Sequence, residues 1–315
     1  MPNLAIVGAG VMGANHGRVA QAVRELTVTA ICDPDLDRAA ASARPHGARY
    51  TRDLDEAMAD ADAVVLATPS DTHAELGVRV LKAGRDLLVE KPIATSADDG
   101  QTLIDAAQAN DRVLMIGHVE RFNPAIAELA NLVDRPVALE ITRASPYPGR
   151  ILADVVLDLM IHDIDLARAI IGGEIVEVTA MGRSVRSGDP DLACALLRFD
   201  NGVVANLTAS RVSQNKVRRL TLTQRENTVV VDLVRQQVEV HRIEHSEYLS
   251  EGGARYRQSG VVEIPYLSQY GEPLVHELRH FAARISDRGQ PLTTAQDALI
   301  ALRVALGVAD SVAGR

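Results

Sequence analysis

Three polar side chains stand in apolar surroundings where they could move a proton and stabilise a negative charge. Lys91 follows the apolar run 87–89, and Asp158 and His162 stand four residues apart within the apolar stretch 155–171. A spacing of four places both side chains on one face of a helix. Imidazole exchanges a proton near neutral pH, and an ammonium group can stabilise an alkoxide. These residues indicate acid–base chemistry; a solvated loop lysine and a satisfied Asp–His pair in a helix core are the alternatives.

A glycine-rich segment near the N-terminus predicts a phosphate-binding turn. Its sequence, Gly8-Ala9-Gly10-Val11-Met12-Gly13, follows the apolar run 4–7 and opens a stretch with helical spacing. The first glycine permits a tight turn, the second lets a pyrophosphate approach the backbone, and the third lets helix and strand pack closely. The helix N-terminus offers N–H donors to phosphate. We therefore expect the segment to bind a dinucleotide through Gly8, Gly10, Val11, Met12 and Gly13.

Asp33 predicts which dinucleotide is bound. It stands 20 residues after Gly13, at the end of the apolar run 28–32. A carboxylate there can accept hydrogen bonds from the ribose hydroxyls, which favours NAD. Arg38 is close enough in sequence to leave NADP possible. The alternative interpretation is a turn-forming Asp before Pro34.

The first half of the chain alternates between two periodicities. Strands are predicted at 4–7, 28–32, 63–67, 87–89 and 113–116, and helices at 12–23, 36–43, 53–59, 73–83 and 96–109. Strands that alternate with helices form βαβ units and a parallel sheet. The predicted fold class is therefore α/β, with residues 1–120 forming an NAD(P)-binding Rossmann domain.

The second half is richer in strands that follow one another through turns. Helices are predicted at 122–132, 155–171, 273–286 and 294–312, strands at 137–143, 175–181, 193–199, 203–210, 218–223, 228–232 and 237–242, and a mobile loop at 244–260. Such a series forms a mostly antiparallel sheet. Residues 121–315 are therefore predicted to be an α+β domain for substrate binding and oligomerisation. One open face of the sheet would be covered in a homodimer or homotetramer.

Composition excludes several classes of protein. The 315 residues include 33 Lys and Arg against 42 Asp and Glu, a net charge of −9, and 3% aromatics. A net acidic chain with few stacking side chains is a poor nucleic-acid binder. No apolar run reaches the length of a membrane span, and no basic, apolar leader opens the chain. Two cysteines, Cys32 and Cys194, fit a reducing compartment, so a cytoplasmic location is expected.

Several motifs together resemble the Gfo/Idh/MocA oxidoreductases. They are the glycine turn, Ala67-Thr68-Pro69 with His73, Glu90-Lys91-Pro92, and Asp158 with His162. Within that family, the segments 117–124, 145–150 and 156–165 are similar to nucleotide-sugar 3-dehydrogenases of the UDP-N-acetylglucosamine type.

The resemblance implies roles for particular residues. His162 would be the acid/base, Asp158 would bind substrate beside it, and Lys91 would steady the oxyanion. Contacts with NAD are implied for Thr68, Pro69, His73, Glu90 and Lys91. The substrate-side candidates are Lys91, Arg121, Tyr147, Arg150, Asp158 and His162.

The leading hypothesis is an NAD-dependent dehydrogenase that oxidises a sugar hydroxyl, at C3 of a nucleotide sugar. A myo-inositol or free-sugar dehydrogenase is the alternative among enzymes, and a non-catalytic dinucleotide sensor is the alternative outside them.

No metal is expected. The motif His276-Glu277-Leu278-Arg279-His280 matches a zinc-protease pattern, but its apolar positions have the spacing of an amphipathic helix.

Overall fold

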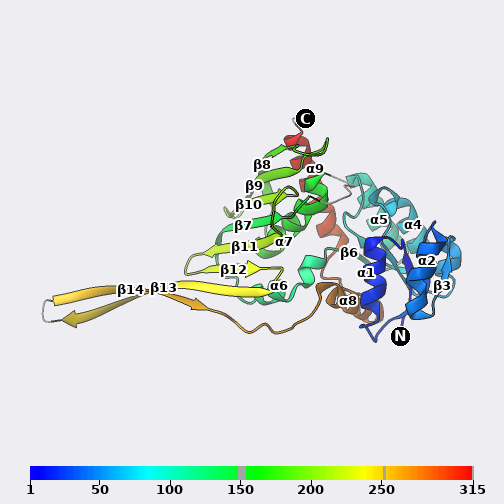
Figure 1. The fold of residues 1–315 in the computed structure, drawn as a ribbon, viewed down its shortest axis with the longest axis horizontal. Coiled ribbons are helices and arrows are strands. Elements are labelled where there is room, and N and C mark those ends of the chain that lie inside the picture. Colours follow the sequence, from blue (N-terminus) through cyan, green and yellow to red (C-terminus); the bar gives the residue numbers. More distant parts are fainter. Residues whose placement is uncertain (148–153, 251–252, 314–315) are drawn as a thin grey trace. The chain divides into compact units, whose positions relative to one another are not determined.

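The structure, a computed structural model, describes residues 1–147, 154–250 and 253–313 (Figure 1). The chain divides into two compact units, one of Met1–Phe122 and Gly271–Arg303 and the other of Asn123–Tyr270 and Val304–Arg315. This division differs from the predicted boundary at residue 120, because Gly271–Arg303 returns to the first unit. Leu278 and Phe281 of that segment are fully buried in one core with Val19 and Val23. The apolar face that the sequence predicts for the helix 273–286 packs this segment into the core of the first unit.

The first unit contains a parallel sheet of six strands among the described residues, in the order β3-β2-β1-β4-β5-β6. Its strands are β1 (Asn3–Val7), β2 (Thr27–Cys32), β3 (Arg49–Thr51), β4 (Ala63–Leu66), β5 (Asp86–Glu90) and β6 (Leu114–Gly117). Leu4, Ile6 and Val65 are completely buried. Burial on both faces explains why these runs do not alternate with polar residues, and the predicted Rossmann arrangement is confirmed.

Helices connect these strands. They are α1 (Val11–Ala20), α2 (Leu36–Ala43), α3 (Leu54–Met58), α4 (His73–Lys82) and α5 (Ala97–Ala109), joined later in the chain by α8 (Pro273–Asp287) and the beginning of α9 (Ala295–Val312). Asp35, Asp53 and Ser96 accept backbone N–H groups at the first turns of α2, α3 and α5. Such caps satisfy donors that the helix itself leaves open. At α1 the capping position is Gly10, which has no side chain to do so.

The second unit contains a sheet of eight strands in the described chain, in the order β14-β13-β12-β11-β7-β10-β9-β8. The strands are β7 (Pro136–Ala144), β8 (Ile175–Arg183), β9 (Leu192–Phe199), β10 (Val204–Ser210), β11 (Val217–Gln224), β12 (Thr228–Asp232), β13 (Gln237–Ser250) and β14 (Gly253–Glu263). The pair β7–β10 is parallel and the other pairs are antiparallel. The predicted mostly antiparallel sheet is confirmed.

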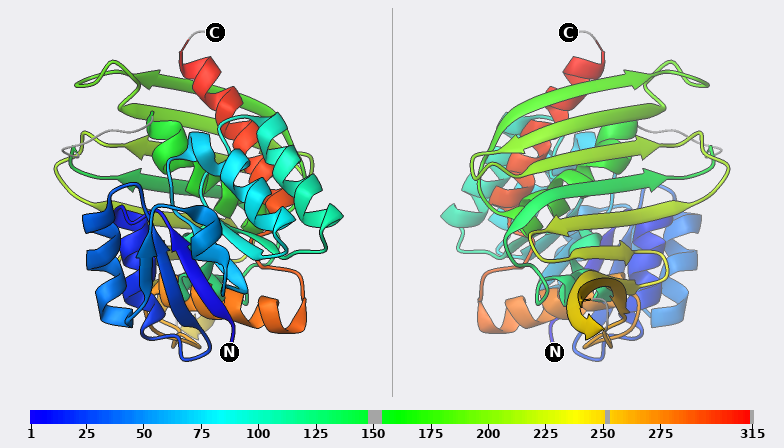
Figure 2. Two further views of the ribbon diagram at one scale, coloured as in Figure 1. Left: turned by 90° about the vertical axis from the view of Figure 1, so that its right-hand side faces the viewer. Right: turned by 90° about the vertical axis from the view of Figure 1, so that its left-hand side faces the viewer.

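One face of this sheet is buried and the other is open. Along β9, Ala193, Ala195 and Leu197 are buried while Leu196 is exposed. Helix α7 (Ile161–Ile171) contacts β7 and β10, and α6 (Pro124–Leu129) contacts β12 and β13. The right-hand view of Figure 2 looks onto the open face.

Two segments differ from the sequence predictions. Residues predicted as a mobile loop at 244–260 form most of the antiparallel pair β13–β14, which Figure 1 shows as a long hairpin. A two-stranded ribbon satisfies its backbone by cross-strand pairing, and the sequence 244–260 is mostly polar, so it carries no run of alternating apolar residues from which a strand could be predicted. The short strand β3 was missed because Arg49 and Tyr50 are exposed at a sheet edge.

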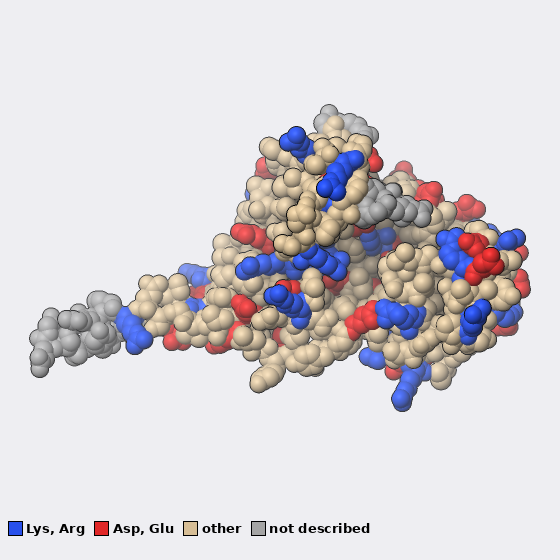
Figure 3. Space-filling view, viewed as in Figure 1, with Lys and Arg blue, Asp and Glu red and all other residues tan. Residues whose placement is uncertain are grey.

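The surface carries both signs of charge. Basic and acidic side chains are interspersed on the face shown in Figure 3. Exposed ion pairs of the described residues include Arg49–Asp60, Arg79–Asp55 and Arg198–Glu177. No helix in the described ranges is both long enough and apolar enough to cross a membrane.

Candidate active site

The glycine turn between β1 and α1 has the geometry that the sequence predicts. Gly8 has φ of 93°, and its N–H donates to the Cys32 carbonyl at 2.7 Å. A Cβ on Gly8 would lie 2.4 Å from the Ala67 carbonyl oxygen, and one on Gly13 would lie 1.7 Å from the Gly8 oxygen. Both positions therefore require glycine, because backbone atoms fill the space that a side chain would need.

Gly10 serves a different purpose from its two neighbours. A Cβ at Gly10 would meet no atom within 4 Å, and the side chain of Val11 is 82% exposed. The first turn of α1 therefore opens onto free space with no side-chain cap on its N–H groups. Open donors at a helix N-terminus suit a phosphate group, so this turn fits the pyrophosphate of NAD.

Asp33 lies at the carboxyl end of β2 and is 5% exposed. Its Oδ2 accepts the Ala9 N–H at 2.7 Å, and its Oδ1 accepts the Asp35 N–H at 2.8 Å. The half-exposed Arg38 approaches Oδ1 at 3.2 Å. Asp33 is thus fixed against the glycine turn, and a carboxylate keeps further acceptor positions for ribose hydroxyls. The Arg38 guanidinium lies beside the Asp33 carboxylate. The 2′-phosphate of NADP would need such a cation there.

His73 joins two loops at the carboxyl ends of β4 and β5. Its Nε2 lies 3.0 Å from the Thr68 carbonyl oxygen, and its Nδ1 lies 2.9 Å from the Pro92 carbonyl oxygen. Thr72 also donates to the Thr68 hydroxyl at 2.7 Å. Burial lowers the pKa of His73, although the two carbonyl groups oppose that shift. With both nitrogens facing carbonyls, the ring ties the Thr68-Pro69 loop to the loop carrying Lys91; a contact between His73 and NAD stays a prediction.

Glu90 ends β5 and anchors the residue that follows it. Its Oε1 lies 2.7 Å from Nε2 of His16 on α1, and its Oε2 accepts the Lys91 N–H at 3.3 Å. Burial alone would raise the pKa of Glu90, but the hydrogen bond from His16 and the charge of Lys91 lower it overall. Glu90 therefore remains a carboxylate that holds the backbone of Lys91, while the Lys91 side chain is half-buried.

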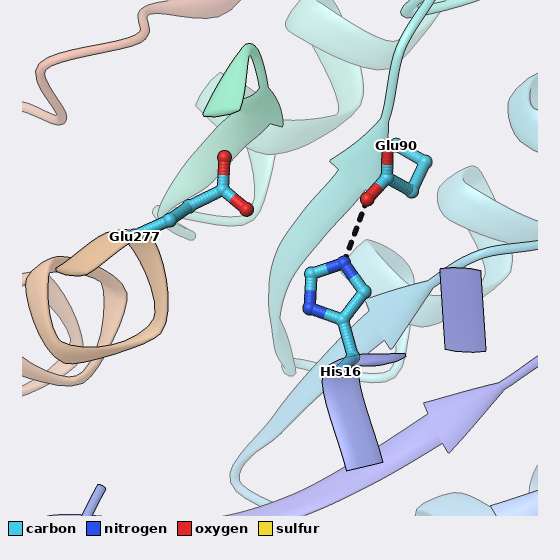
Figure 4. Close-up of side chains that lie close together, drawn as sticks. All are labelled: His16, Glu90 and Glu277. Atoms are coloured by element: carbon cyan, nitrogen blue, oxygen red, sulfur yellow. Dashed lines mark hydrogen bonds and ion pairs between the residues drawn. The ribbon is translucent and has the colours of Figure 1, made fainter. Parts of the chain in front are cut away.

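A second buried carboxyl group lies near this pair (Figure 4). Glu277 of α8 is completely buried, and atoms of Glu277, His16 and Glu90 lie within 4.8 Å of one another. One nitrogen and two carboxylates can hold a divalent metal ion, so these three residues are the candidate metal ligands of the described chain. Sequence reasoning did not assign His16 and Glu277 to the site, because they are distant in sequence from each other and from Glu90.

The histidines that flank Glu277 in the zinc-like motif do not join this cluster. Nε2 of His280 accepts the Leu292 N–H at 2.9 Å, and the ring packs against Phe122 with centroids 5.4 Å apart. The motif belongs to an amphipathic helix that faces the core on one side.

In the second unit, Asp158 and His162 lie on either side of a helix junction. Asp158 belongs to a π-helical turn, Val156–Met160, and His162 to the first turn of α7. The sequence predicted a continuous α-helix. Asp154 caps the π turn by accepting the Val156 N–H at 2.7 Å and the Leu157 N–H at 3.1 Å. Single π turns occur often at functional sites, and both side chains here are half-buried.

A buried ion pair fixes the start of α7. Arg143 of β7 donates from Nη2 to Oδ1 of Asp163 at 2.7 Å and from Nε to both oxygens at 2.9 and 3.1 Å. Both side chains are at most 3% exposed. Because Asp163 directly follows His162, this pair fixes the helix turn that presents the imidazole.

The remaining candidates are placed as follows. Arg121 lies half-buried in the turn Val119–Phe122 of the first unit. Tyr147 lies in the second unit, with the Arg186 guanidinium 5.3 Å from its ring centroid. Arg150 lies outside the described residues. Lys91 and the NAD-binding candidates thus belong to one unit, and Asp158, His162 and Tyr147 to the other.

Each of the two units contains a segment that matches the model of a known protein family. Residues 3–118 match the model of an oxidoreductase family with an NAD-binding Rossmann fold, and residues 141–230 match the Gfo/Idh/MocA C-terminal domain.

Individual relatives are named dehydrogenases. The chain is 34% identical over 238 residues to UDP-N-acetylglucosamine 3-dehydrogenase of Acidithiobacillus ferrooxidans, covering 75% of each chain. It is 26% identical over 331 residues to scyllo-inositol 2-dehydrogenase (NAD(+)) of Bacillus subtilis, covering 98% of this chain and 93% of the relative. A solved structure of the Acidithiobacillus enzyme matches with a TM-score of 0.90 and 30% identity, over 99% of this chain and 98% of that one. The chain therefore belongs to the Gfo/Idh/MocA family of NAD-binding oxidoreductases.

Proposed function

We propose that this protein oxidises a secondary hydroxyl of a sugar with NAD, and that its substrate is a nucleotide sugar oxidised at C3, such as UDP-N-acetylglucosamine. The observation that carries the proposal is the anchoring of Lys91. Glu90 fixes its backbone, and its strand lies in the same parallel sheet as the open phosphate-binding turn. Ligands bind at the carboxyl ends of strands in such sheets. The 34% identity with a UDP-N-acetylglucosamine 3-dehydrogenase supports the choice of sugar.

The chemistry follows from the residue types. His162 takes the hydroxyl proton as the C–O bond becomes a carbonyl. The Lys91 ammonium stabilises the negative charge that develops on that oxygen, and Asp158 orients the sugar beside the imidazole. NAD, when bound, supplies the acceptor for the hydrogen and electron pair that leave the carbon. In this proposal, Lys91 and His162 converge on one carbinol, with Arg121 and Tyr147 on the substrate side.

A nucleotide-sugar panel tests the substrate. The purified protein is incubated with NAD and each sugar, and NADH absorbance is followed. We expect UDP-N-acetylglucosamine to give the highest kcat/KM, and free N-acetylglucosamine to give little reduction. Equal rates with free and nucleotide-linked sugars would rule out recognition of the nucleotide.

An inositol or free-sugar dehydrogenase is the second candidate. It is supported by the scyllo-inositol relative, which aligns with 98% of this chain. Reduction of NAD by myo-inositol or scyllo-inositol, with none by nucleotide sugars, would favour it. A dinucleotide sensor predicts NAD binding without reduction by any sugar in the panel.

We also propose that the protein self-associates as a dimer or tetramer through the open face of the large sheet. Met181 and Leu196 are 75% and 50% exposed, although they lie on paired strands β8 and β9. An apolar sheet face of this kind is commonly covered by a partner. We expect light scattering at micromolar concentration to give a dimer or larger, and Leu196→Asp to reduce the mass. A monomeric wild-type protein would contradict this proposal.

Two free cysteines are consistent with a cytoplasmic location, which is likewise proposed.

A further inference from the structure

Four neighbouring strands of the large sheet, β7, β10, β9 and β8, have their ends in one row (Figure 1). Across the strands, Arg183 pairs with Leu192, Leu192 pairs with Ser210, and Ser210 pairs with Ala144. The row therefore contains the ends of β8, β10 and β7 and the beginning of β9. Segments that leave these strands are brought together at one end of the sheet.

The segment between β8 and β9 is fixed to a buried carboxylate. Oδ2 of Asp191, which is completely buried, accepts three consecutive backbone N–H groups at 2.6–3.0 Å, from Val185, Arg186 and Ser187. Oδ1 of the same residue accepts Nε–H of the buried Arg211 at 2.9 Å. The backbone of Arg186 is therefore held against the interior, while its side chain is exposed.

The same segment is joined to the turn that carries Asp158. The Pro190 carbonyl accepts the Val155 N–H at 3.2 Å and Nη2–H of Arg211 at 3.1 Å. Val155 directly precedes the π-helical turn, so Asp158 stands about 5 Å along the helix axis from that contact. The loop with the exposed arginine and the turn with Asp158 thus form one connected part of the second unit.

The Arg186 guanidinium lies over the ring of Tyr147, which follows β7, with 5.3 Å between its Cζ and the ring centroid. Two strands separate β7 from β8, at about 4.8 Å per step, so the segment 184–190 must reach across the ends of β9 and β10. Stacking uses the face of a guanidinium and leaves the N–H groups on its edge available. Among the described residues no carboxylate pairs with Arg186.

We propose that Arg186 binds the diphosphate of a nucleotide-sugar substrate, and that Tyr147 is the positioning residue that holds its guanidinium. This inference rests on the proposed function and assigns a contact within that same site. A guanidinium presents parallel N–H donors that match two phosphate oxygens, and a diphosphate supplies the counter-charge that Arg186 lacks. The diphosphate joins the sugar to the nucleoside, so a diphosphate held at Arg186 lets the sugar extend toward Asp158.

The phosphate groups of NAD are the competing occupants. The glycine turn of the first unit already offers them open backbone donors at the start of α1. Arg186 belongs instead to the second unit, together with the substrate-side candidates Asp158, His162 and Tyr147. The nucleotide sugar is therefore the better matched ligand.

Titration calorimetry with UDP tests the contact without turnover, because UDP carries the diphosphate but no sugar. Arg186→Gln should weaken UDP binding by about 10- to 100-fold, since charge-assisted hydrogen bonds to phosphate are lost. Arg186→Lys keeps the charge without the paired donors, so its affinity should lie between those of Arg186→Gln and the wild type.

Arg225→Gln is the matched control for this titration. Arg225 is also exposed and stands in the turn after β11, at the opposite end of the sheet, because the neighbouring Gln224 pairs with Pro136 at the beginning of β7. The substitution removes the same charge, and UDP should bind as to the wild type. Equal UDP affinities of Arg186→Gln and Arg225→Gln would overturn the proposal.

Steady-state kinetics separate this contact from the proposed function. With UDP-N-acetylglucosamine and NAD, Arg186→Gln should raise KM for the sugar by about 10- to 100-fold and leave KM for NAD unchanged. Unchanged kinetics of Arg186→Gln would remove the diphosphate contact and leave the dehydrogenase intact. A wild type that neither binds UDP nor oxidises any nucleotide sugar would remove both. A raised KM for NAD alone would assign Arg186 to the dinucleotide and contradict the proposal.

A double variant tests the role of Tyr147. Tyr147→Leu should weaken UDP binding, and the double variant with Arg186→Gln should bind UDP no more weakly than Arg186→Gln alone, because Tyr147 acts through the guanidinium. Additive losses would contradict the positioning role. Thermal unfolding of each variant completes the test: a lowered Tm with unchanged UDP affinity would mean that the stacked pair only braces the loop, which would overturn the proposal.

Discussion

At the scale of single residues, the proposed chemistry is assigned to a lysine and a histidine. A different neighbouring residue holds each of them in place. Lys91 is held through its backbone by Glu90. His162 is held through its neighbour Asp163, which is fixed to the sheet by Arg143. Each reactive group is therefore placed by a residue next to it in sequence.

Removing either reactive group should stop turnover and spare cofactor binding. We expect His162→Ala to lower kcat by about 10²–10⁴-fold, the usual contribution of general acid–base catalysis. Lys91→Met should have a comparable effect, because the alkoxide loses its cation. NAD affinity, measured by calorimetry, should stay close to that of the wild type. Near-normal turnover of the correct sugar by both variants would remove this mechanism.

Asp33 should determine the preference for NAD. Replacing it with Ala removes the acceptor for ribose hydroxyls and releases Arg38, which now approaches Asp33 at 3.2 Å. A hydrogen bond to a charged group contributes about 1.5–3 kcal/mol, so NAD affinity should fall by about 10- to 100-fold. The ratio of kcat/KM for NADP to that for NAD should rise. Arg38→Ala in the same background should cancel the gain for NADP, and an unchanged cofactor ratio in Asp33→Ala would contradict the assignment.

At the scale of elements, the Arg143–Asp163 pair stabilises the packing of α7 on the large sheet. Asp163→Asn leaves a buried guanidinium without its counter-charge, which typically costs about 3–5 kcal/mol. Chemical unfolding should show that loss. Glu177→Gln, which alters an exposed pair with Arg198, should change stability by no more than about 1 kcal/mol. Similar losses in both variants would mean that the buried pair has no special role.

Most elements could be predicted from the sequence, because buried residues form apolar runs in the strands and recur at helical spacing in the helices. The strands around Ile6, Val65 and Leu88 are apolar on both faces, and the glycine turn combines a motif with its strand–helix context. The polar sequence 244–260 and the edge strand β3, where Arg49 and Tyr50 are exposed, leave no such pattern.

The site was predictable only where its residues form local motifs. Glu90-Lys91-Pro92 and Asp158 with His162 are visible in sequence. The cluster of His16, Glu90 and Glu277 is not, because its members are brought together by packing of α1, β5 and α8. The π-helical turn at Asp158 also lacks a local signal, since its residues resemble those of an ordinary apolar helix.

At the scale of the whole molecule, the two units contain buried carboxyl groups that respond to pH in opposite directions. Asp191 is completely buried in the second unit. Burial alone would raise its pKa, but hydrogen bonds from the backbone of Arg186, from Ser187 and from Val185 lower it well below the ordinary value. Glu277 in the first unit has a raised pKa.

Asp191 should therefore lose its contribution to stability in acid. A depressed folded pKa contributes stability above the unfolded pKa of about 3.9, and that stability is lost as pH falls below it. We expect Asp191→Asn to be less stable than the wild type at pH 7, with the difference shrinking as the solution is acidified. Denaturant titrations at several pH values measure this, and a constant difference would contradict the assignment.

The central claim is that a lysine of the first unit and an imidazole of the second act on one hydroxyl group. A crystal structure with NAD and the accepted sugar tests it most directly. We predict that Lys91 Nζ and a ring nitrogen of His162 both lie within about 2.6–3.2 Å of the same carbinol oxygen. Either nitrogen lying beyond hydrogen-bonding reach of that oxygen, with no bridging water, would contradict the account.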